Sequence, residues 1–270
     1  NTVQLNMGSS PQTPEGGFKT STYEKAPFGG LGASAPVFSE IGLLAGVAQT
    51  DWSWSPLVAD FDHDGFRDLI VTNGFPKDIT DRDFMMFRME SGSVASKAML
   101  LEQIPVVKLH NYAYRNRGAA AWTAVSESGN DGVFEEVSKD WGITQPSFSN
   151  GAAYADFDGD GDLDYVVNNI NDSAFVYRNN QVERGDKRHF LRINFKGEGR
   201  NPQGLGAMVE LKTSVGTQFY EHSPYRGYLA TQEATAHFGL GEAVTVEEVK
   251  ITWPSNRVQV LKNVKADQVL

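Results

Sequence analysis

The chain has 270 residues, of which 40% are hydrophobic and 21% charged, and its formal net charge is −10 at pH 7. This length is enough for one large domain or two ordinary domains with a sizeable core. The 34 acidic against 24 basic residues argue against a nucleic-acid surface, and no apolar run approaches the roughly 18 residues of a membrane span. The absence of cysteine excludes disulfide bonds, thiolate metal sites and cysteine nucleophiles.

Both ends of the sequence look internal to a longer protein. The first residue is Asn1 rather than a methionine, no signal sequence is visible, and the last three residues are typical of the middle of a strand. We therefore expect any targeting or anchoring signal to lie outside this sequence.

An internal repeat relates residues 37–73 to residues 133–169 without a gap, at a constant offset of 133 − 37 = 96. Both copies begin with Val-Phe and later carry the pattern Ala-Asp-Phe-Asp-x-Asp-Gly-x-x-Asp. The repeat extends upstream, because residues 1–8 and 111–118 both follow Asn-x-x-x-x-Asn-x-Gly, and a third start lies at residues 174–180. Four short strands per unit predict β-propeller blades.

Two segments depart from the repeat. Residues 75–105 lie between the units and predict a helical insertion with Asp81 as its N-cap, either a binding element at the propeller rim or a packing cap. From residue 189 onward, period-two alternation between Gly or Pro turns predicts a small antiparallel β domain. We therefore place the propeller blades in residues 1–181, a polar linker in residues 182–188 and the β domain in residues 189–270.

The repeated aspartate segments have the composition of calcium loops. Ca²⁺ prefers about six to eight oxygen ligands, and side chains at positions 1, 3 and 5 of a tight turn converge on one point. A glycine at position 6 permits the reversal, the position-7 carbonyl adds a ligand, and the position-9 aspartate completes the site. The predicted ligands are Asp60, Asp62, Asp64, Phe66 and Asp68 in the first loop and Asp156, Asp158, Asp160, Asp162 and Asp164 in the second.

Other interpretations of these loops fit less well. An EF-hand needs a glutamate at position 12, which is Val71 or Val167 here, and Mg²⁺ prefers fewer carboxylates. Zinc would want histidine or cysteine, and the one candidate, His63, is expected to point outward. Catalytic carboxylates would need one raised pKa, whereas carboxylates that face a cation have lowered pKa values. The remaining alternative to a calcium site is that both segments are acidic surface turns that bind no ion.

These motifs resemble a known family. The aspartate units resemble FG-GAP or VCBS repeats, the calcium-loop blades also seen in integrin α-subunit propellers. The segment after residue 189 resembles the ASPIC/UnbV domain, through Gly204–Ala207, Gly227-Tyr228, His237–Gly241 and Trp253-Pro254. The combination is similar to the family of cartilage acidic protein 1 and its bacterial surface relatives. The resemblance implies a calcium-binding, all-β protein with a partial β-propeller, although about two blades are fewer than a propeller normally has.

The resemblance also implies a location and a role. The family is extracellular or associated with the cell envelope, in some members with the outer membrane, for which a lipid anchor would lie outside this sequence. It has no established catalytic activity and is thought to act in adhesion or assembly. We therefore expect a calcium-stabilised scaffold that binds a protein or a glycan. The alternatives are a subunit of an outer-membrane transport or secretion complex, and a polysaccharide-active enzyme with His237, Gln232 and Tyr228 as its candidate residues.

Overall fold

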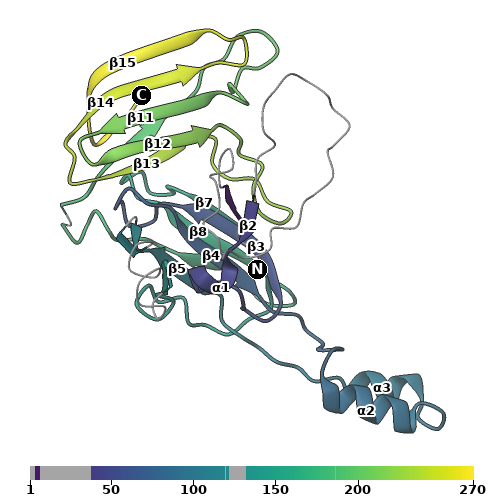
Figure 1. Ribbon diagram of the computed structural model, residues 1–270. Coiled ribbons are helices and arrows are strands. Elements are labelled where there is room, and N and C mark those ends of the chain that lie inside the picture. The colour runs from purple at the N-terminus through teal and green to yellow at the C-terminus, as the bar shows by residue number, and fades with distance from the viewer. Residues whose placement is uncertain (1–3, 7–37, 119, 122–131, 186) are drawn as a thin grey trace, which may run out of the picture. The chain divides into compact units, whose positions relative to one another are not determined.

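The computed structural model describes residues 4–6, 38–118, 120–121, 132–185 and 187–270 (Figure 1). Most described residues in regular structure are in β-strands, arranged in several antiparallel sheets with few helices, which confirms the predicted all-β class. The described part of the chain contains no closed propeller. It divides into two compact units: described residues up to 49 and from 117 to 135 form the first, and residues 50–116 and 136–270 form the second.

The described residues of the first unit include a small two-stranded sheet and a short helix. Strand β1 (Gln4–Asn6) pairs antiparallel with β2 (Phe38–Glu40), and α1 (Gly42–Ala45) follows. Gly46 ends α1 in the left-handed conformation, with φ of +81°, and its N–H donates to carbonyls of the last turn. Of the predicted repeat start at residues 1–8, only the three residues of β1 are described.

Two blade-like sheets follow, and their strands belong to the second unit apart from Phe134 and Glu135 of β6. One has the strand order β3 (Ser53–Ala59), β4 (Asp68–Asn73), β5 (Tyr112–Asn116), β6 (Phe134–Glu136). The other has the order β7 (Ser149–Ala155), β8 (Asp164–Asn169), β9 (Phe175–Tyr177). The β3–β4 and β7–β8 hairpins carry their register irregularity at equivalent positions, so the sequence repeat is also a structural repeat.

Each blade-like sheet combines strands from two successive copies of the sequence repeat. Strand β4 closes the first repeat unit, yet it pairs with β5, which opens the second, and β8 pairs in the same way with β9. The helical insertion therefore connects β4 to β5, two neighbouring strands of one sheet. The physical reason is that β4 needs a hydrogen-bonded neighbour on its free edge, and the next strand-forming segment supplies it.

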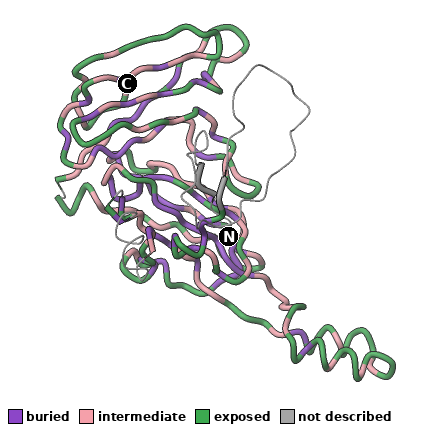
Figure 2. The backbone as a smooth tube through the Cα atoms, in the orientation of Figure 1, coloured by how far each residue is buried: buried purple, intermediate pink, exposed green. Residues whose placement is uncertain are grey.

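The insertion contains two helices, α2 (Arg82–Ser91) and α3 (Lys97–Glu102). Asp81 is the N-cap of α2, as predicted, because its carboxylate accepts a hydrogen bond of 2.7 Å from the Phe84 N–H. Phe84 is the only buried residue of α2, and α3 buries none, as Figure 2 also shows. The insertion is therefore not a packing cap over a sheet.

Residues 189–270 form two sheets. One has the order β13 (Ala236–Gly241), β10 (His189–Ile193), β16 (Gln268–Val269). The other has the order β12 (Gly216–Glu221), β11 (Met208–Thr213), β14 (Thr245–Thr252), β15 (Val258–Lys265). All pairs are antiparallel except β10–β16, which is parallel. The predicted antiparallel domain is confirmed apart from this one pair, for which the intervening strands form the long crossover that a parallel pair requires.

Each part of the second unit has its own hydrophobic core. The C-terminal core is built from both of its sheets and includes Leu191, Leu211, Phe238 and Val249, each at most 1% exposed. The blade core is smaller and joins both blade sheets through residues such as Leu57, Ile70 and Val167. A fully buried side chain of this kind stabilises a fold by about 1.5–3 kcal/mol, so each core supports the loops at its margin.

Candidate metal centre

The two aspartate loops occupy the same place in the two blade sheets. The first connects β3 to β4 and the second connects β7 to β8. At their bases, Ala59 pairs with Asp68 and Ala155 pairs with Asp164. The antiparallel register therefore brings position 9 of each loop back beside position 1, as the nine-residue pattern predicts.

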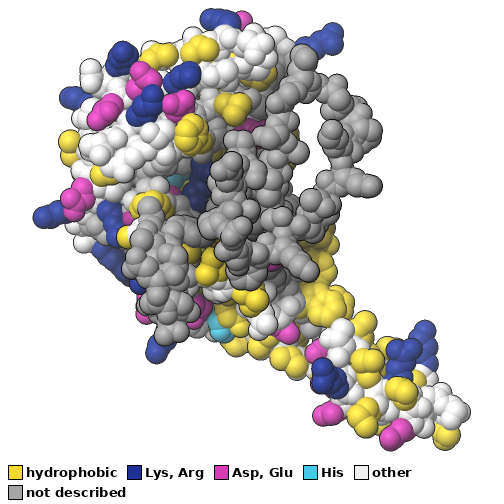
Figure 3. All heavy atoms as spheres, viewed as in Figure 1, with side chains coloured by type: hydrophobic (Ala, Val, Ile, Leu, Met, Phe, Trp, Pro, Cys, Tyr) yellow, Lys and Arg dark blue, Asp and Glu magenta, His cyan; other side chains and the backbone are white. Residues whose placement is uncertain are grey.

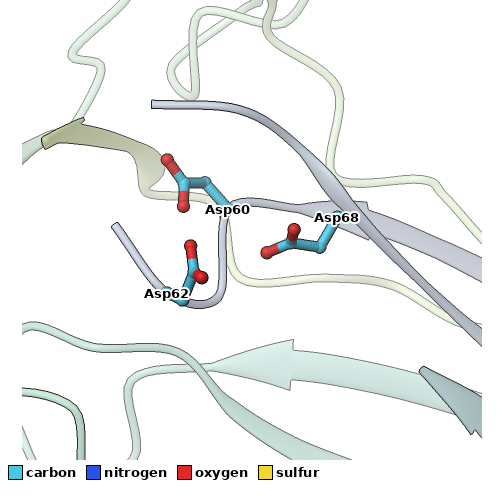
Figure 4. A group of neighbouring side chains, drawn as sticks. All are labelled: Asp60, Asp62 and Asp68. Carbon is cyan, nitrogen blue, oxygen red and sulfur yellow. The ribbon is translucent and has the colours of Figure 1, made fainter. Parts of the chain in front are cut away.

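Three carboxylates meet in the first loop. Asp60, Asp62 and Asp68 each offer an oxygen, and these oxygens all lie within 4.8 Å of one another (Figure 4). All three residues are buried. Removing several like charges from water is costly unless a counter-ion joins them, so this donor set fits a hard divalent cation.

The second loop repeats the arrangement in a more open setting. Oxygens of Asp156, Asp158 and Asp164 also lie within 4.8 Å of one another. Asp164 is buried, but the Asp158 side chain is 33% exposed, against 6% for its counterpart Asp62. The same donor set is therefore present twice, with different access to solvent.

The position-9 aspartate organises each loop. Asp68 accepts hydrogen bonds from the N–H groups of Phe61, at 3.0 Å, and Asn116, at 2.9 Å. Asp164 accepts the equivalent pair from Phe157, at 2.9 Å, and Asn179, at 2.8 Å. Each carboxylate thus joins the start of its loop to the third strand of its sheet. The asparagine itself recurs because its side-chain amide donates to an equivalent loop carbonyl, from Asn116 to Arg67 at 3.1 Å and from Asn179 to Leu163 at 3.4 Å.

The position-1 aspartate fixes the loop reversal. Asp60 accepts hydrogen bonds from the N–H groups of Asp64 and Gly65, and Asp156 accepts the equivalent bond from Gly161. Gly65 and Gly161 have φ of +92° and +103°, which only glycine adopts readily. The glycine predicted at position 6 is therefore required by the backbone conformation.

Positions 5 and 7 lie outside the two clusters. The position-5 carboxylates turn onto their own loops, with Asp64 accepting from the Phe66 N–H at 2.8 Å and Asp160 accepting from the Asp162 N–H at 3.1 Å. The Asp162 carboxylate accepts from the Val182 N–H at 3.3 Å. The structure thus brings together positions 1, 3 and 9. Ligation by Asp64 and Asp160 and through the Phe66 and Asp162 carbonyls stays a prediction.

Arginines complete both loops, and the sequence reasoning missed them. Arg115 Nε lies 3.0 Å from an Asp62 oxygen, and the equivalent Arg178 Nε lies 2.6 Å from Asp158. Arg188 adds a second contact of 3.0 Å to Asp62. The signal was present, because Tyr-Arg-Asn recurs at 114–116 and 177–179 beside the matched asparagines. The four aspartates of the first loop carry a charge of −4, and Arg115 and Arg188 offset part of it through their contacts with Asp62.

Burial shapes the acid–base behaviour of the first loop. Burial, followed by repulsion from Asp68 and its neighbours, raises the pKa of Asp60 well above its ordinary value. Burial, followed by repulsion from Asp62, raises the pKa of Asp68 to about 8 and that of Asp64 to about 6. Without a cation the loop therefore favours bound protons, which a divalent ion would displace.

The second loop shows a weaker form of this effect. Burial raises the pKa of Asp162 to about 7 and also raises that of Asp160. The pKa values of these aspartates are raised, whereas carboxylates that face a cation are expected to have lowered pKa values. Burial and mutual repulsion are the causes of the increase, and a cation would oppose both.

Strands of the C-terminal sheet lie directly against both loops. Gly239 of β13 touches the Asp60 carboxylate so closely that a side chain there would collide with it and with the His63 backbone. Arg192 of β10 forms ion pairs with Asp156 and Glu233. Strands β10 and β13 of the C-terminal sheet therefore pack against the two loops.

His63, the zinc candidate of the first loop, is fully buried. Its ring centroid lies 5.0 Å from that of His237 and 5.6 Å from that of Phe190. The side chain is buried because the C-terminal sheet covers this side of the loop.

The residues of the enzyme alternative have separate surroundings. Burial lowers the pKa of His237 well below its ordinary value, so the ring is neutral between its aromatic neighbours. Gln232 accepts a hydrogen bond from the Tyr154 N–H at 2.7 Å, and the Tyr228 ring packs against Trp54 at 4.9 Å. All three serve contacts between the blades and the C-terminal sheets.

Two family models match the chain. Residues 52–82, which contain the first loop, match the FG-GAP repeat, and residues 197–270 match the family described as ASPIC and UnbV. The chain is thus similar to these two families over these segments, as the motifs predicted. No helix in the described part of the chain is long and apolar enough to cross a membrane.

Curated relatives show the same kinship at low identity. The chain is 28% identical to cartilage acidic protein 1 of Homo sapiens over 165 residues, covering 59% of the chain and 24% of the relative. It is 29% identical to the Mus musculus protein over 170 residues, covering 60% and 25%. Against the Xenopus tropicalis protein it is 26% identical over 219 residues, covering 74% and 33%. The chain spans about a quarter to a third of the length of these relatives.

Proposed function

We propose that this chain is a calcium-stabilised binding and scaffold module of the cell surface or extracellular space. The observation that carries the proposal is the repeated geometry of the two loops. Each loop gathers three aspartates within 4.8 Å and anchors the last of them with equivalent backbone hydrogen bonds. A structural cation is the simplest reason to place the same donor set in both sheets.

Calcium would be held by the three clustered aspartates of each loop, with Asp64, Phe66, Asp160 and Asp162 as the further predicted donors. Bound there, it would supply positive charge that removes the repulsion among the carboxylates. The protein's own residues set the rest: Asp68 and Asp164 tie each loop to the neighbouring strand, and Arg192 ties the second loop to the C-terminal sheet.

The role is proposed to be non-catalytic and extracellular. The FG-GAP and ASPIC/UnbV matches support a surface protein, and calcium loops of this kind need affinities of only about 10⁻⁴–10⁻³ M in that environment. His237, the candidate for the enzyme alternative, has buried ring nitrogens, and burial lowers its pKa so that the ring is neutral.

The helical insertion is the proposed protein-binding element. Met86, Met89, Val94 and Leu101 expose between 50% and 89% of their surface, and Figure 3 shows hydrophobic side chains spread over this part of the molecule. Exposed apolar surface of this size marks interaction sites in soluble proteins, and methionine adapts well to varied partners. The partner is proposed to be another protein of the cell envelope, which includes the case of a fixed subunit in an outer-membrane complex.

Calorimetric titration with Ca²⁺, together with thermal melts in calcium and in EDTA, tests the proposal. We expect two binding events and a higher melting temperature with calcium, since a ligand at 100 times its Kd stabilises by about 2.7 kcal/mol per site. Asp60→Asn and Asp156→Asn should each remove one event, whereas Asp83→Asn, an exposed residue of α2, should remove none. Identical melts in calcium and EDTA with no binding heat would sink the proposal.

A further inference from the structure

A cavity of about 500 Å³ beside the first loop is lined mainly by positive charge, although the chain as a whole is negatively charged. It is lined by residues of both blade sheets and of the segments after β6 and β9. Its cationic side chains are Arg115, Lys139, Arg178, Arg184 and Arg188, against the two carboxylates of Asp62 and Asp140. A protein with 34 acidic and 24 basic residues has therefore gathered positive charge around one hollow, which we call the basic cavity.

The cations of the basic cavity are not all used by the protein. Arg115 and Arg188 contact Asp62, and Arg178 contacts Asp158. Lys139 and Arg184 are exposed and make no ion pair within the described part of the chain. At least these two charges can face an anionic ligand.

The wall of the basic cavity also offers aromatic rings and an unpaired hydroxyl. Trp141, Tyr165 and Tyr177 line it, and the two tyrosine rings stack at 5.4 Å. The Tyr177 hydroxyl oxygen is buried and has no hydrogen-bond partner among the described residues. Buried polar atoms without a partner are rare and costly, so this one indicates a polar group that enters the cavity.

We infer that the basic cavity binds a short saccharide that carries carboxylate groups. Guanidinium and ammonium groups pair with carboxylates, aromatic rings pack against the C–H faces of sugars, and the side-chain amides of Asn180 and Gln181 suit hydroxyls. The volume lies within the range of about 300–1,000 Å³ that small-ligand sites show. The inference deepens the proposed binding function, on which it rests, by naming a ligand class and a site.

Titration calorimetry with three probes tests the ligand class, at fixed calcium concentration. The probes are tri-galacturonic acid, a sulfated galactose trisaccharide and the neutral galactose trisaccharide. We expect the uronic acid to bind and the neutral sugar to bind at least about tenfold more weakly, because charge-assisted hydrogen bonds are lost. Binding of the sulfated sugar alone would assign the site to sulfate esters and overturn the carboxylate assignment, and equal binding of the neutral sugar would overturn the inference.

Two variants test the site itself. Lys139→Ala with Arg184→Ala should weaken binding of the uronic acid by about tenfold or more, because the two unpaired charges are gone. The matched control, Lys262→Ala with Lys265→Ala on exposed β15, removes the same charge and should leave the affinity unchanged. Equal weakening in both would mean diffuse attraction only and would overturn the site. Tyr177→Phe should weaken binding about fivefold without lowering the melting temperature, since the hydroxyl has no protein partner.

The inference and the proposed function fail differently. If calcium still raises the melting temperature while no probe binds the wild-type protein, the basic cavity is not a saccharide site and the scaffold proposal stands. If calcium has no effect while tri-galacturonic acid binds and the Lys139/Arg184 variant loses it, the saccharide site stands and the calcium proposal falls.

Discussion

The two aspartate loops share one motif but differ in what surrounds them. In the first loop, the clustered carboxylates are all buried, and the neighbouring β13 approaches through Gly239, which brings no charge. In the second loop, Asp158 is partly exposed, and the neighbouring β10 contributes the cation of Arg192. The nine residues of each loop therefore fix the geometry of the oxygen donors. The neighbouring strand of the C-terminal sheet decides how strongly each site depends on a bound cation to balance its carboxylates.

The largest expected difference in stability between the two loops comes from Arg192, which contacts the second loop. Its side chain and the Asp156 carboxylate are both less than 10% exposed, so Arg192→Met leaves a buried charge without its partner. We expect a loss of about 3–5 kcal/mol in the free energy of unfolding, measured by urea denaturation in EDTA. Arg257→Met is the control, because the exposed Arg257–Glu198 pair should contribute only about 0–1 kcal/mol. Equal losses in the two variants would show that Arg192 does not hold the second loop.

The next largest expected difference between the loops comes from Gly239, which contacts the first loop. A methyl group at this position would meet the Asp60 carboxylate and the His63 backbone, so one of them must move. Gly239→Ala should cost about 1–3 kcal/mol and weaken calcium binding at the first loop alone. The control is Gly241→Ala in the same strand, which meets only a backbone oxygen at 3.5 Å and tests the strain of a positive φ without the collision. Loss of the second calcium event in Gly239→Ala would contradict the assignment of β13 to the first loop.

Sequence reasoning predicted more of the loops than of their surroundings. The aspartates, the glycine reversal and the all-β class follow from local patterns, because positions within nine residues of chain are fixed by turn geometry. The contacts of Arg188, Arg192 and Gly239 join segments more than 30 residues apart, and no periodicity encodes such pairs. The combination of strands from two copies of the repeat in one sheet was missed for the same reason, since strand pairing is decided by neighbours in space. The arginines of the Tyr-Arg-Asn tripeptides were the exception, because their recurrence was visible.

A third prediction gives the loops unequal responses to the same substitution. Asp60→Asn removes a charge that burial and repulsion already disfavour, so the metal-free melting temperature should change little. Asp156→Asn weakens the Arg192 ion pair and should cost about 1–3 kcal/mol without metal. Each variant should still lose one calcium event. Equal destabilisation of the two metal-free variants would show that the loops are energetically alike.

The smallest effect is the dependence of metal-free stability on pH. The pKa of Asp68 is raised to about 8 and that of Asp64 to about 6, above their ordinary value of 3.8. A raised pKa in the folded state gives stability that is fully present below about pH 4 and is lost as pH rises through the folded values. The EDTA-treated protein should therefore melt at a lower temperature at pH 8 than at pH 5.

Calcium should reverse that trend, because the ion displaces protons and binds more tightly as pH rises. Melts at pH 5 and pH 8 in Asp68→Asn, which lacks the most strongly shifted of these two groups, provide the control and should show a flatter metal-free profile. The first loop carries the more strongly shifted groups, so Asp162→Asn in the second loop should flatten the profile less. If Asp162→Asn flattened it more, the greater need of the first loop for its ion would be disproved.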